Sequence, residues 1–152
     1  MAHPMSDDEL LSFLSSEPAH TGKLATMRAD GRPHVAPLWF ALDTTTIDDD
    51  SPIGDVMFNT GANSLKGKAL RRDARVSLCV DDERPPFAFA TIEGIATVSE
   101  ELGEMARWAA IIGGRYMGAE NAERYGQRNA VPGELLVRVR PTHIVAVADM
   151  AD

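Results

Sequence analysis

Short apolar runs separated by turn-forming residues dominate the chain. Two of these runs, residues 23–28 and 34–42, flank the dipeptide Asp30-Gly31, which is typical of a hairpin turn that needs a positive φ angle. The pattern therefore predicts a β-hairpin. Pro37 lies inside the second run and has no N–H to donate. We expect that strand to be bulged or at a sheet edge, where a ligand can approach the backbone.

Further extended runs follow, and they favour a mainly β fold. We expect strands at residues 55–60, 75–80 and 87–98, and one or two more within 135–147, which Pro141 interrupts. Gly94 marks a bulge or bend in the longest run. Residues 43–55 are polar and acidic and are predicted to form a solvated loop. Many short strands with hairpin-like connections favour an antiparallel barrel or closed sheet over a doubly wound parallel one.

The helical segments are few and are marked by their capping residues. Ser6 and Glu9 have the spacing of a capping box, which predicts a short amphipathic helix that ends before Pro18. Ser99 is the predicted N-cap of a longer helix whose apolar spacing weakens at Gly113-Gly114. Tyr116-Met117 and Ala122–Tyr125 indicate a second short helix.

Size and charge narrow the class of protein. The 152 residues, 44% of them hydrophobic, predict a single domain spanning residues 1–152. The formal net charge of −8 argues against general binding to nucleic acid or to anionic membranes. No apolar run reaches the length of a membrane span, and the N-terminus lacks the features of a signal peptide. We therefore expect a cytoplasmic protein with no nucleic-acid or membrane partner.

Several kinds of catalytic site leave no trace in the sequence. The chain has no Gly-x-Ser-x-Gly motif, and its four His residues are scattered at positions 3, 20, 34 and 143. Metal-ligand spacings of His and Cys are also missing, so no metal site is predicted. Cys79 lies in an apolar run and is interpreted as a buried strand thiol. A hydrolase is therefore disfavoured.

One basic segment contrasts with this acidic chain. Five of the fifteen Lys and Arg residues lie between Lys66 and Arg75, with Asp73 the only acid among them. Ser64 is a plausible N-cap for a helix that starts there. Free backbone N–H groups, the helix dipole and Lys side chains would then converge on one small volume, which favours a phosphate site. From spacing alone, a solvated basic helix packed on the core remains an equal alternative.

Several sequence blocks, taken together and in this order, resemble the split-barrel flavin-binding superfamily. The resemblance is to the branch related to pyridoxamine 5'-phosphate oxidase that uses the deazaflavin coenzyme F420. The blocks are Ala29–Phe40, Phe58–Thr60, Ser64–Lys68, Leu70–Val76, Glu93-Gly94 and Glu134–Val139. The resemblance implies a six-stranded antiparallel split β-barrel. It also implies a homodimer with two cofactor sites at the subunit interface.

The same resemblance implies the cofactor-binding residues. Those that hold the cofactor phosphate are Asn59, Thr60, Ser64, Lys66 and Lys68. Those on the strand beside the cofactor ring are His34, Ala36, Pro37 and Leu38. Leu65 stands where pyridoxamine-phosphate oxidases carry an Arg, which makes FMN a less favoured cofactor than F420.

Some of these assignments have structural alternatives. Phe87 falls where an aromatic residue of the partner subunit covers the site in relatives, or it is an ordinary core aromatic. His34 faces either the ligand or solvent. Arg71, Arg72 and Arg75 either pair with acidic neighbours or reach a polyglutamate tail of the cofactor.

The leading hypothesis is an F420-dependent oxidoreductase that passes a hydride to an electron-poor C=C or C=N bond of a small organic substrate. The sequence indicates no proton donor. A split-barrel carrier of FMN or haem without turnover is the alternative from another class. A nucleic-acid binder that uses the segment from Lys66 to Arg75 is a third hypothesis, which the acidic surface disfavours.

Overall fold

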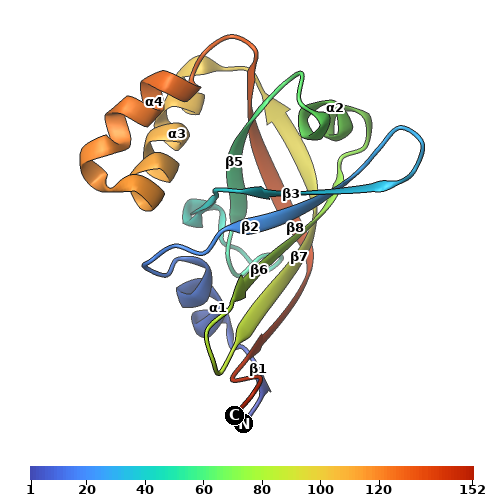
Figure 1. The fold of residues 1–152 in the computed structure, drawn as a ribbon, viewed down its shortest axis with the longest axis vertical. Helices are drawn as coiled ribbons and strands as arrows, with labels where there is room; N and C mark the ends of the chain where they lie inside the picture. Colours follow the sequence, from blue (N-terminus) through green and yellow to red (C-terminus); the bar gives the residue numbers. More distant parts are fainter.

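An antiparallel β-sheet forms the centre of the structure, a computed structural model that describes residues 1–152 (Figure 1). Its eight strands are β1 (His3–Pro4), β2 (Gly22–Met27), β3 (Pro33–Leu38), β4 (Ala41–Asp43), β5 (Asp55–Gly61), β6 (Arg75–Asp82), β7 (Ala88–Ser99) and β8 (Glu134–Ala148). The helices are α1 (Asp7–Leu14), α2 (Leu65–Arg72), α3 (Leu102–Met117) and α4 (Ala122–Asn129), with 3-10 turns at Thr44–Thr46 and Ala119–Asn121. None of these helices is both long enough and apolar enough to cross a membrane.

The sheet curls without closing through hydrogen bonds. Its order is β3-β2-β6-β7-β8-β5-β4, with β1 added to β8, and all the pairs are antiparallel. The strands at the two ends of this order, β3 and β4, are separated in the chain only by Trp39 and Phe40. The predicted mainly antiparallel split barrel is confirmed. Six strands have six or more residues, and the two short strands β1 and β4 were not expected.

A cluster of 18 buried hydrophobic residues fills the inside of the curled sheet. Its members alternate along the strands, as a sheet with one buried face requires; on β6 they are Val76, Leu78 and Val80. Leu10 and Leu14 of α1 and Leu70 of α2 complete the cluster. Removal of this apolar surface from water is the main stabilising contribution to the barrel.

A second, smaller cluster attaches α3 to the outside of the barrel. It joins Met105, Trp108 and Ile112 of α3 to Met57 of β5 and Leu136 of β8. In Figure 1, α3 and α4 lie together beside the upper part of β5. The helical pair therefore covers the part of the sheet that adjoins the interrupted edge.

Local sequence signals set several boundaries correctly. The Asp30-Gly31 turn joins β2 to β3, and Gly31 has a φ of 87°. The Ser6 hydroxyl accepts a hydrogen bond from the Glu9 N–H, and the Glu9 carboxylate accepts one from the Ser6 N–H. β3, which contains Pro37, is an edge strand. The pairing of β7 with β8 shifts register between Glu93 and Gly94, which confirms the predicted bulge.

The longer helix differs from the prediction at both ends. Glu101, not Ser99, is the N-cap of α3, and its carboxylate accepts two backbone N–H groups of the first turn. The helix also continues through Gly113-Gly114. A Cβ placed on Gly113 would stand 2.3 Å from the Cβ of Tyr125. This glycine is therefore a close-packing position between α3 and α4 and not the end of a helix.

The acidic segment 43–55 is not the solvated loop that was predicted, because its two ends are buried. Asp43 and Asp55 face each other in the β4–β5 pair, and both accept hydrogen bonds from Arg138, at 2.8 and 2.9 Å. Arg140 also donates to Asp55, at 3.3 Å. Burial alone would raise the pKa of Asp43, but hydrogen bonds from Thr45 and Arg138 outweigh it and hold this pKa below its usual value.

Replacing Arg138 with Met should lower the free energy of unfolding by about 2–4 kcal/mol, because two buried carboxylates would each lose a charged hydrogen-bond donor. The depressed pKa of Asp43 means that the pair stabilises the fold above the ordinary aspartate pKa of about 3.9 and less as pH falls below it. The difference between the proteins should therefore shrink below about pH 4. Urea unfolding at several pH values measures it. Arg107→Met is the control, since its ion pair with Glu104 is exposed and should contribute under about 0.5 kcal/mol. Equal losses in both variants would contradict this account.

Candidate functional site

The interrupted edge of the sheet is the place where the predicted residues other than Phe87 lie. β4 pairs with β5 only from Asp43–Asp55 to Ala41–Met57, so the end of β5 from Phe58 to Gly61 has a strand partner on one side only. β3 likewise pairs only with β2. Because two residues link β3 to β4, the free edges of β3 and β5 flank the same opening. Backbone groups at such edges are available to a ligand.

The turn from β5 into α2 is built by Ser64. Its hydroxyl donates to the Gly61 carbonyl at 2.7 Å and accepts from the Gly67 N–H at 3.0 Å, and it lies 3.3 Å from the Thr60 hydroxyl. Ser64 is the N-cap of α2, as predicted. The N–H groups of Leu65 and Lys66 have no acceptor within the chain. They project from the positive end of the helix dipole, which suits an anion.

Lys66 is the cation best placed for that anion. Its side chain is half-buried and makes no hydrogen bond or ion pair with the protein, and burial lowers its pKa. A negative charge beside it would raise this pKa again by direct attraction. Lys68 is exposed and also has no partner. Arg71 and Arg75 instead pair with Glu100 and Asp73, so they follow the structural alternative.

Two buried polar atoms without partners belong to the strands that border the opening. The Asn59 Nδ2 and His34 Nδ1 atoms are buried and unpaired, as are Thr26 Oγ1 and Trp108 Nε1. Thr26 lies directly opposite His34 in the β2–β3 pair. Leaving such an atom unsatisfied costs about 1–3 kcal/mol, so an unpaired atom at a free strand edge suggests a missing ligand. The residues present therefore fit a ligand that offers hydrogen-bond acceptors.

The remaining predicted residues of β3 differ in exposure. Ala36 is half-buried, Pro37 is exposed, and Leu38 is buried in the main core. The Leu38 side chain is therefore committed to packing, and only its backbone can meet a ligand. On β5, Thr60 has the same strand parity as core residue Phe58, whereas Asn59 has that of Met57, which packs on α3. The predicted residues thus border the opening from both faces of the sheet.

Phe87 lies apart from the other nine predicted residues. It follows β6 in the turn before β7, at the narrow end of the molecule beside the chain termini, whereas α2 lies at the wide end (Figure 1). It is not a core aromatic, because 39% of it is exposed. Its φ of 65° is unusual for a residue with a side chain, and the Met150 N–H donates to its carbonyl. Within one copy of the chain, Phe87 does not border the opening.

Sequence reasoning missed the two residues that hold the link between β3 and β4. Arg115 donates to the Phe40 carbonyl at 2.6 Å and also to the Leu14 carbonyl. Tyr116 accepts from the Phe40 N–H at 3.4 Å and donates to the His20 carbonyl at 2.6 Å. The backbone groups that these two side chains bind lie 75 to 101 residues away in the sequence. Contacts at that separation leave no local signal in the sequence. Burial lowers the pKa of Arg115 and raises that of Tyr116.

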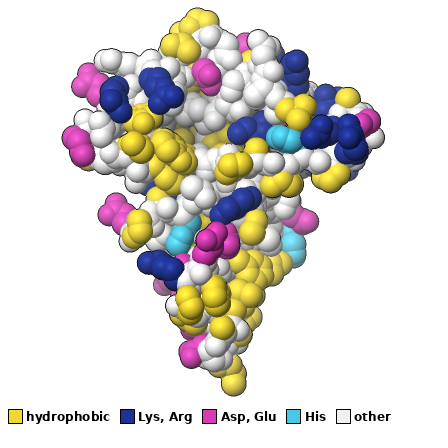
Figure 2. Space-filling view, viewed as in Figure 1, with side chains coloured by type: hydrophobic (Ala, Val, Ile, Leu, Met, Phe, Trp, Pro, Cys, Tyr) yellow, Lys and Arg dark blue, Asp and Glu magenta, His cyan; other side chains and the backbone are white.

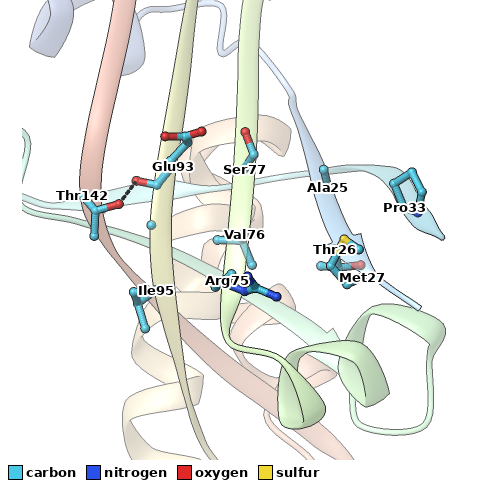
Figure 3. A pocket seen from close by; sticks show the side chains of 11 residues that line it. Ala25, Thr26, Met27, Pro33, Arg75, Val76, Ser77, Glu93, Ile95 and Thr142 are labelled. Atoms are coloured by element: carbon cyan, nitrogen blue, oxygen red, sulfur yellow. Dashed lines mark hydrogen bonds between the residues drawn. The ribbon is translucent and has the colours of Figure 1, made fainter. Parts of the chain in front are cut away.

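A separate depression of about 470 Å³ lies on the outer face of β2, β6 and β7. None of the ten predicted residues lines it. Figure 3 shows Ser77, Glu93 and Ile95 on adjacent strands in this depression, with the Thr142 hydroxyl donating to the Glu93 carbonyl at 3.2 Å. No helix covers this face, and Ile95 is 43% exposed. The surface is open and partly apolar, which suits a broad contact better than an enclosed small molecule.

Comparison with known proteins identifies a family model and a relative that match most of this chain. The family model described as pyridoxamine 5'-phosphate oxidase matches residues 6–148. An F420-dependent biliverdin reductase of Mycobacterium tuberculosis is 29% identical over 145 residues, which cover 95% of this chain and 90% of the relative.

Two solved structures show similar folds. A conserved hypothetical protein of Mycobacterium tuberculosis has a TM-score of 0.76 and 30% identity over 93% of this chain and 84% of its own. A haem storage protein of Vibrio cholerae has a TM-score of 0.65 at 19% identity, over 91% of this chain and 93% of its own. The second likeness concerns the fold alone.

Gly67 is the glycine that the α2 turn requires. A Cβ on Gly67 would stand 2.1 Å from the Gly61 carbonyl oxygen, whereas one on Gly61 would meet nothing closer than 3.9 Å. Gly67→Ala should therefore displace the start of α2 and lower the free energy of unfolding by about 1–3 kcal/mol. Gly61→Ala should change it much less. Chemical denaturation of both variants measures the difference, and equal stability would refute the geometry of this turn.

Proposed function

Because the chain belongs to the pyridoxamine 5'-phosphate oxidase family, we propose that it is an oxidoreductase that binds coenzyme F420 at the opening between β3 and β5. In this proposal it transfers a hydride to an electron-poor C=C or C=N bond of a small organic substrate. The observation that carries the proposal is the set of unpaired groups at the opening, which are the Lys66 ammonium, the first N–H groups of α2 and the Asn59 amide. The similarity to an F420-dependent reductase supports the choice of cofactor.

The reduced deazaflavin would supply the hydride, and the protein would supply position and environment. Lys66 and the N–H groups of Leu65 and Lys66 would bind the phosphate at the start of α2. The free edge of β3 around Pro37 would lie beside the ring. The hydride brings two electrons to the substrate carbon, and one proton from water or a side chain completes the reduction of the double bond.

The side chain of Leu65 supports a deazaflavin over FMN. It is 42% exposed at the first position of α2, next to Lys66, and it offers no charge to a phosphate. The opening therefore has one half-buried cation, Lys66, and one exposed cation, Lys68. Arg72, which donates to the Met27 carbonyl at 2.9 Å, has no acidic partner and remains available to a longer anionic tail.

A carrier of FMN or haem is the second candidate, and His34 is the residue that favours it. An imidazole on an edge strand beside the opening can serve as an axial haem ligand as well as a hydrogen-bonding group. The two functions differ in a simple observable. A carrier would be yellow or red as isolated and would have no reductase activity, whereas the proposed enzyme would bind added F420.

We also propose that two copies of the chain assemble through the outer face of β2, β6 and β7. Figure 2 shows hydrophobic side chains gathered along the lower strands of this view, where no helix covers the sheet. Exposed Ile95 and Val145 lie on β7 and β8 there. This assembly would let Phe87 of one copy approach the opening of the other.

Replacing Lys66 with Ala should weaken F420 binding about ten- to hundredfold, because one charge-assisted hydrogen bond to the phosphate would be lost. Fluorescence quenching of the coenzyme on titration with protein measures the affinity. The fold should stay intact, since Lys66 makes no contact with another side chain through hydrogen bonds. Arg107→Ala is the control, because Arg107 lies on α3, pairs with the exposed Glu104 and should not affect the affinity. Equal affinity in Lys66→Ala would refute the phosphate assignment, and no binding by the unmodified protein at micromolar coenzyme would refute the function.

Replacing Ile95 with Asp should raise the dissociation constant of the dimer at least about tenfold, because a charge would be buried at its centre. Analytical ultracentrifugation over a range of protein concentrations measures the change. Ile111→Asp is a matched control, since Ile111 is 42% exposed on α3, away from this face. A dimer that is insensitive to Ile95→Asp would move the interface elsewhere, and a monomeric unmodified protein would end the assembly proposal.

A further inference from the structure

We propose that Trp39, Tyr125, Arg124 and Arg128 form the wall that binds the substrate, and that the substrate is a planar conjugated molecule with an anionic group. The substrate role rests on the oxidoreductase function proposed above. The wall itself rests on separate observations, which are an exposed and rigidly supported indole and two guanidinium groups without an ion pair.

Trp39 stands at the opening between β3 and β5. It is the first residue after β3, and 37% of it is exposed. Trp39 is two residues before Ala41 and has the strand parity of the α3 side of the sheet, where Ala41 and Met57 pack. Its ring contacts those of Tyr116 and Tyr125, which belong to α3 and α4. The indole therefore lies between the end of β3 and these two helices.

The indole is held in place before any ligand binds. Its ring stacks on Tyr116 with 5.0 Å between centroids and 4° between planes, and it meets Tyr125 at 5.8 Å and 60°. Tyr116 is fixed by its two backbone hydrogen bonds, and Tyr125 is only 6% exposed. A fixed aromatic surface binds a flat ligand with little loss of side-chain entropy. This support explains why a large aromatic residue can remain partly exposed there.

Arg124 and Arg128 add positive charge to the same surface. Their guanidinium groups lie 5.3 and 5.5 Å from the centre of the Tyr125 ring, one helical turn apart on α4. Neither forms an ion pair. Eight of the fifteen Lys and Arg side chains do so in this acidic chain. Two cations left free beside an exposed indole, among 23 acidic residues, suit an external anion.

The molecular surface shows hydrophobic and positively charged side chains side by side in this region (Figure 2). Figure 2 shows hydrophobic side chains gathered over the α3–α4 side of the molecule, bordered by Lys and Arg side chains. The second set of unpaired cations, Lys66 and Lys68, lies on α2 across the opening. The two sets would thus serve two anions, the cofactor phosphate on α2 and an anionic substituent of the substrate on α4.

A pair of fluorescent probes tests the wall without cofactor or turnover. Anilinonaphthalene sulfonate is planar and anionic, and phenylnaphthylamine has the same ring skeleton without the sulfonate. The double variant Arg124→Gln/Arg128→Gln should weaken binding of the sulfonate about tenfold and of the neutral probe less than about twofold. Trp39→Leu should weaken both probes about fivefold or more, and Trp39→Phe should restore part of the loss.

Arg107→Gln is the control, because Arg107 lies over the Trp108 ring on α3 but pairs with Glu104. It should leave both probes unaffected. The proposal is overturned if the arginine variant weakens both probes equally, if Arg107→Gln weakens the sulfonate as much as the double variant does, or if neither Trp39→Leu nor the double variant changes binding. Unchanged thermal melts establish that each variant is folded.

Titration of the same variants with coenzyme F420 separates this proposal from the function on which it rests. The wall residues should leave the cofactor affinity within about twofold, while Lys66→Ala lowers it. F420 binding by the unmodified protein together with probe binding that is insensitive to the wall would refute the wall alone. Probe binding that depends on the wall without any F420 binding would refute the cofactor assignment alone.

Discussion

The hydrogen-bond ladder between β4 and β5 stops at Ala41 and Met57, and the arrangement of the rest of the molecule depends on this stop. Beyond it the chain enters the link of Trp39 and Phe40, whose backbone is bound by Arg115 and Tyr116 of α3. Satisfying the Phe40 groups from a helix allows the sheet to remain open without leaving these buried polar atoms unpaired. In this link, hydrogen bonds with side chains of α3 replace those that a neighbouring strand would make. The opening, and the unpaired groups that border it, result from this replacement.

The pairing of charged side chains differs between the opening and the rest of the molecule. Away from the opening, buried acids are matched by cations, as where Arg138 bridges Asp43 and Asp55. Near it, Lys66 on α2 and Arg124 and Arg128 on α4 remain without acidic partners although the chain carries a net charge of −8.

Local chemistry made the hairpin, the capping box at Ser6 and the N-cap at Ser64 predictable, because each depends on residues within a few positions. Most of the candidate site followed from the blocks around β3 and α2. The contacts of Arg115 and Arg138 could not be predicted, since their partners lie 75 to 101 residues away. Gly113 was misread for the same reason, because its close neighbour Tyr125 belongs to another helix. Phe87 was grouped with the site by resemblance, but within one chain it lies in the turn between β6 and β7, at the other end of the molecule from α2 (Figure 1).

The length of the link between β3 and β4 is as strongly constrained as its composition. Side chains along a strand alternate between faces, so one inserted residue before Ala41 would turn β4 over. The carboxylate of Asp43 would leave Arg138, and Leu42 would exchange its place with Ala41 and Asp43. A deletion would have the same effect. Divergence among related chains can therefore change the side chain at position 39, and with it the molecules that are accepted, far more readily than it can add or remove a residue there.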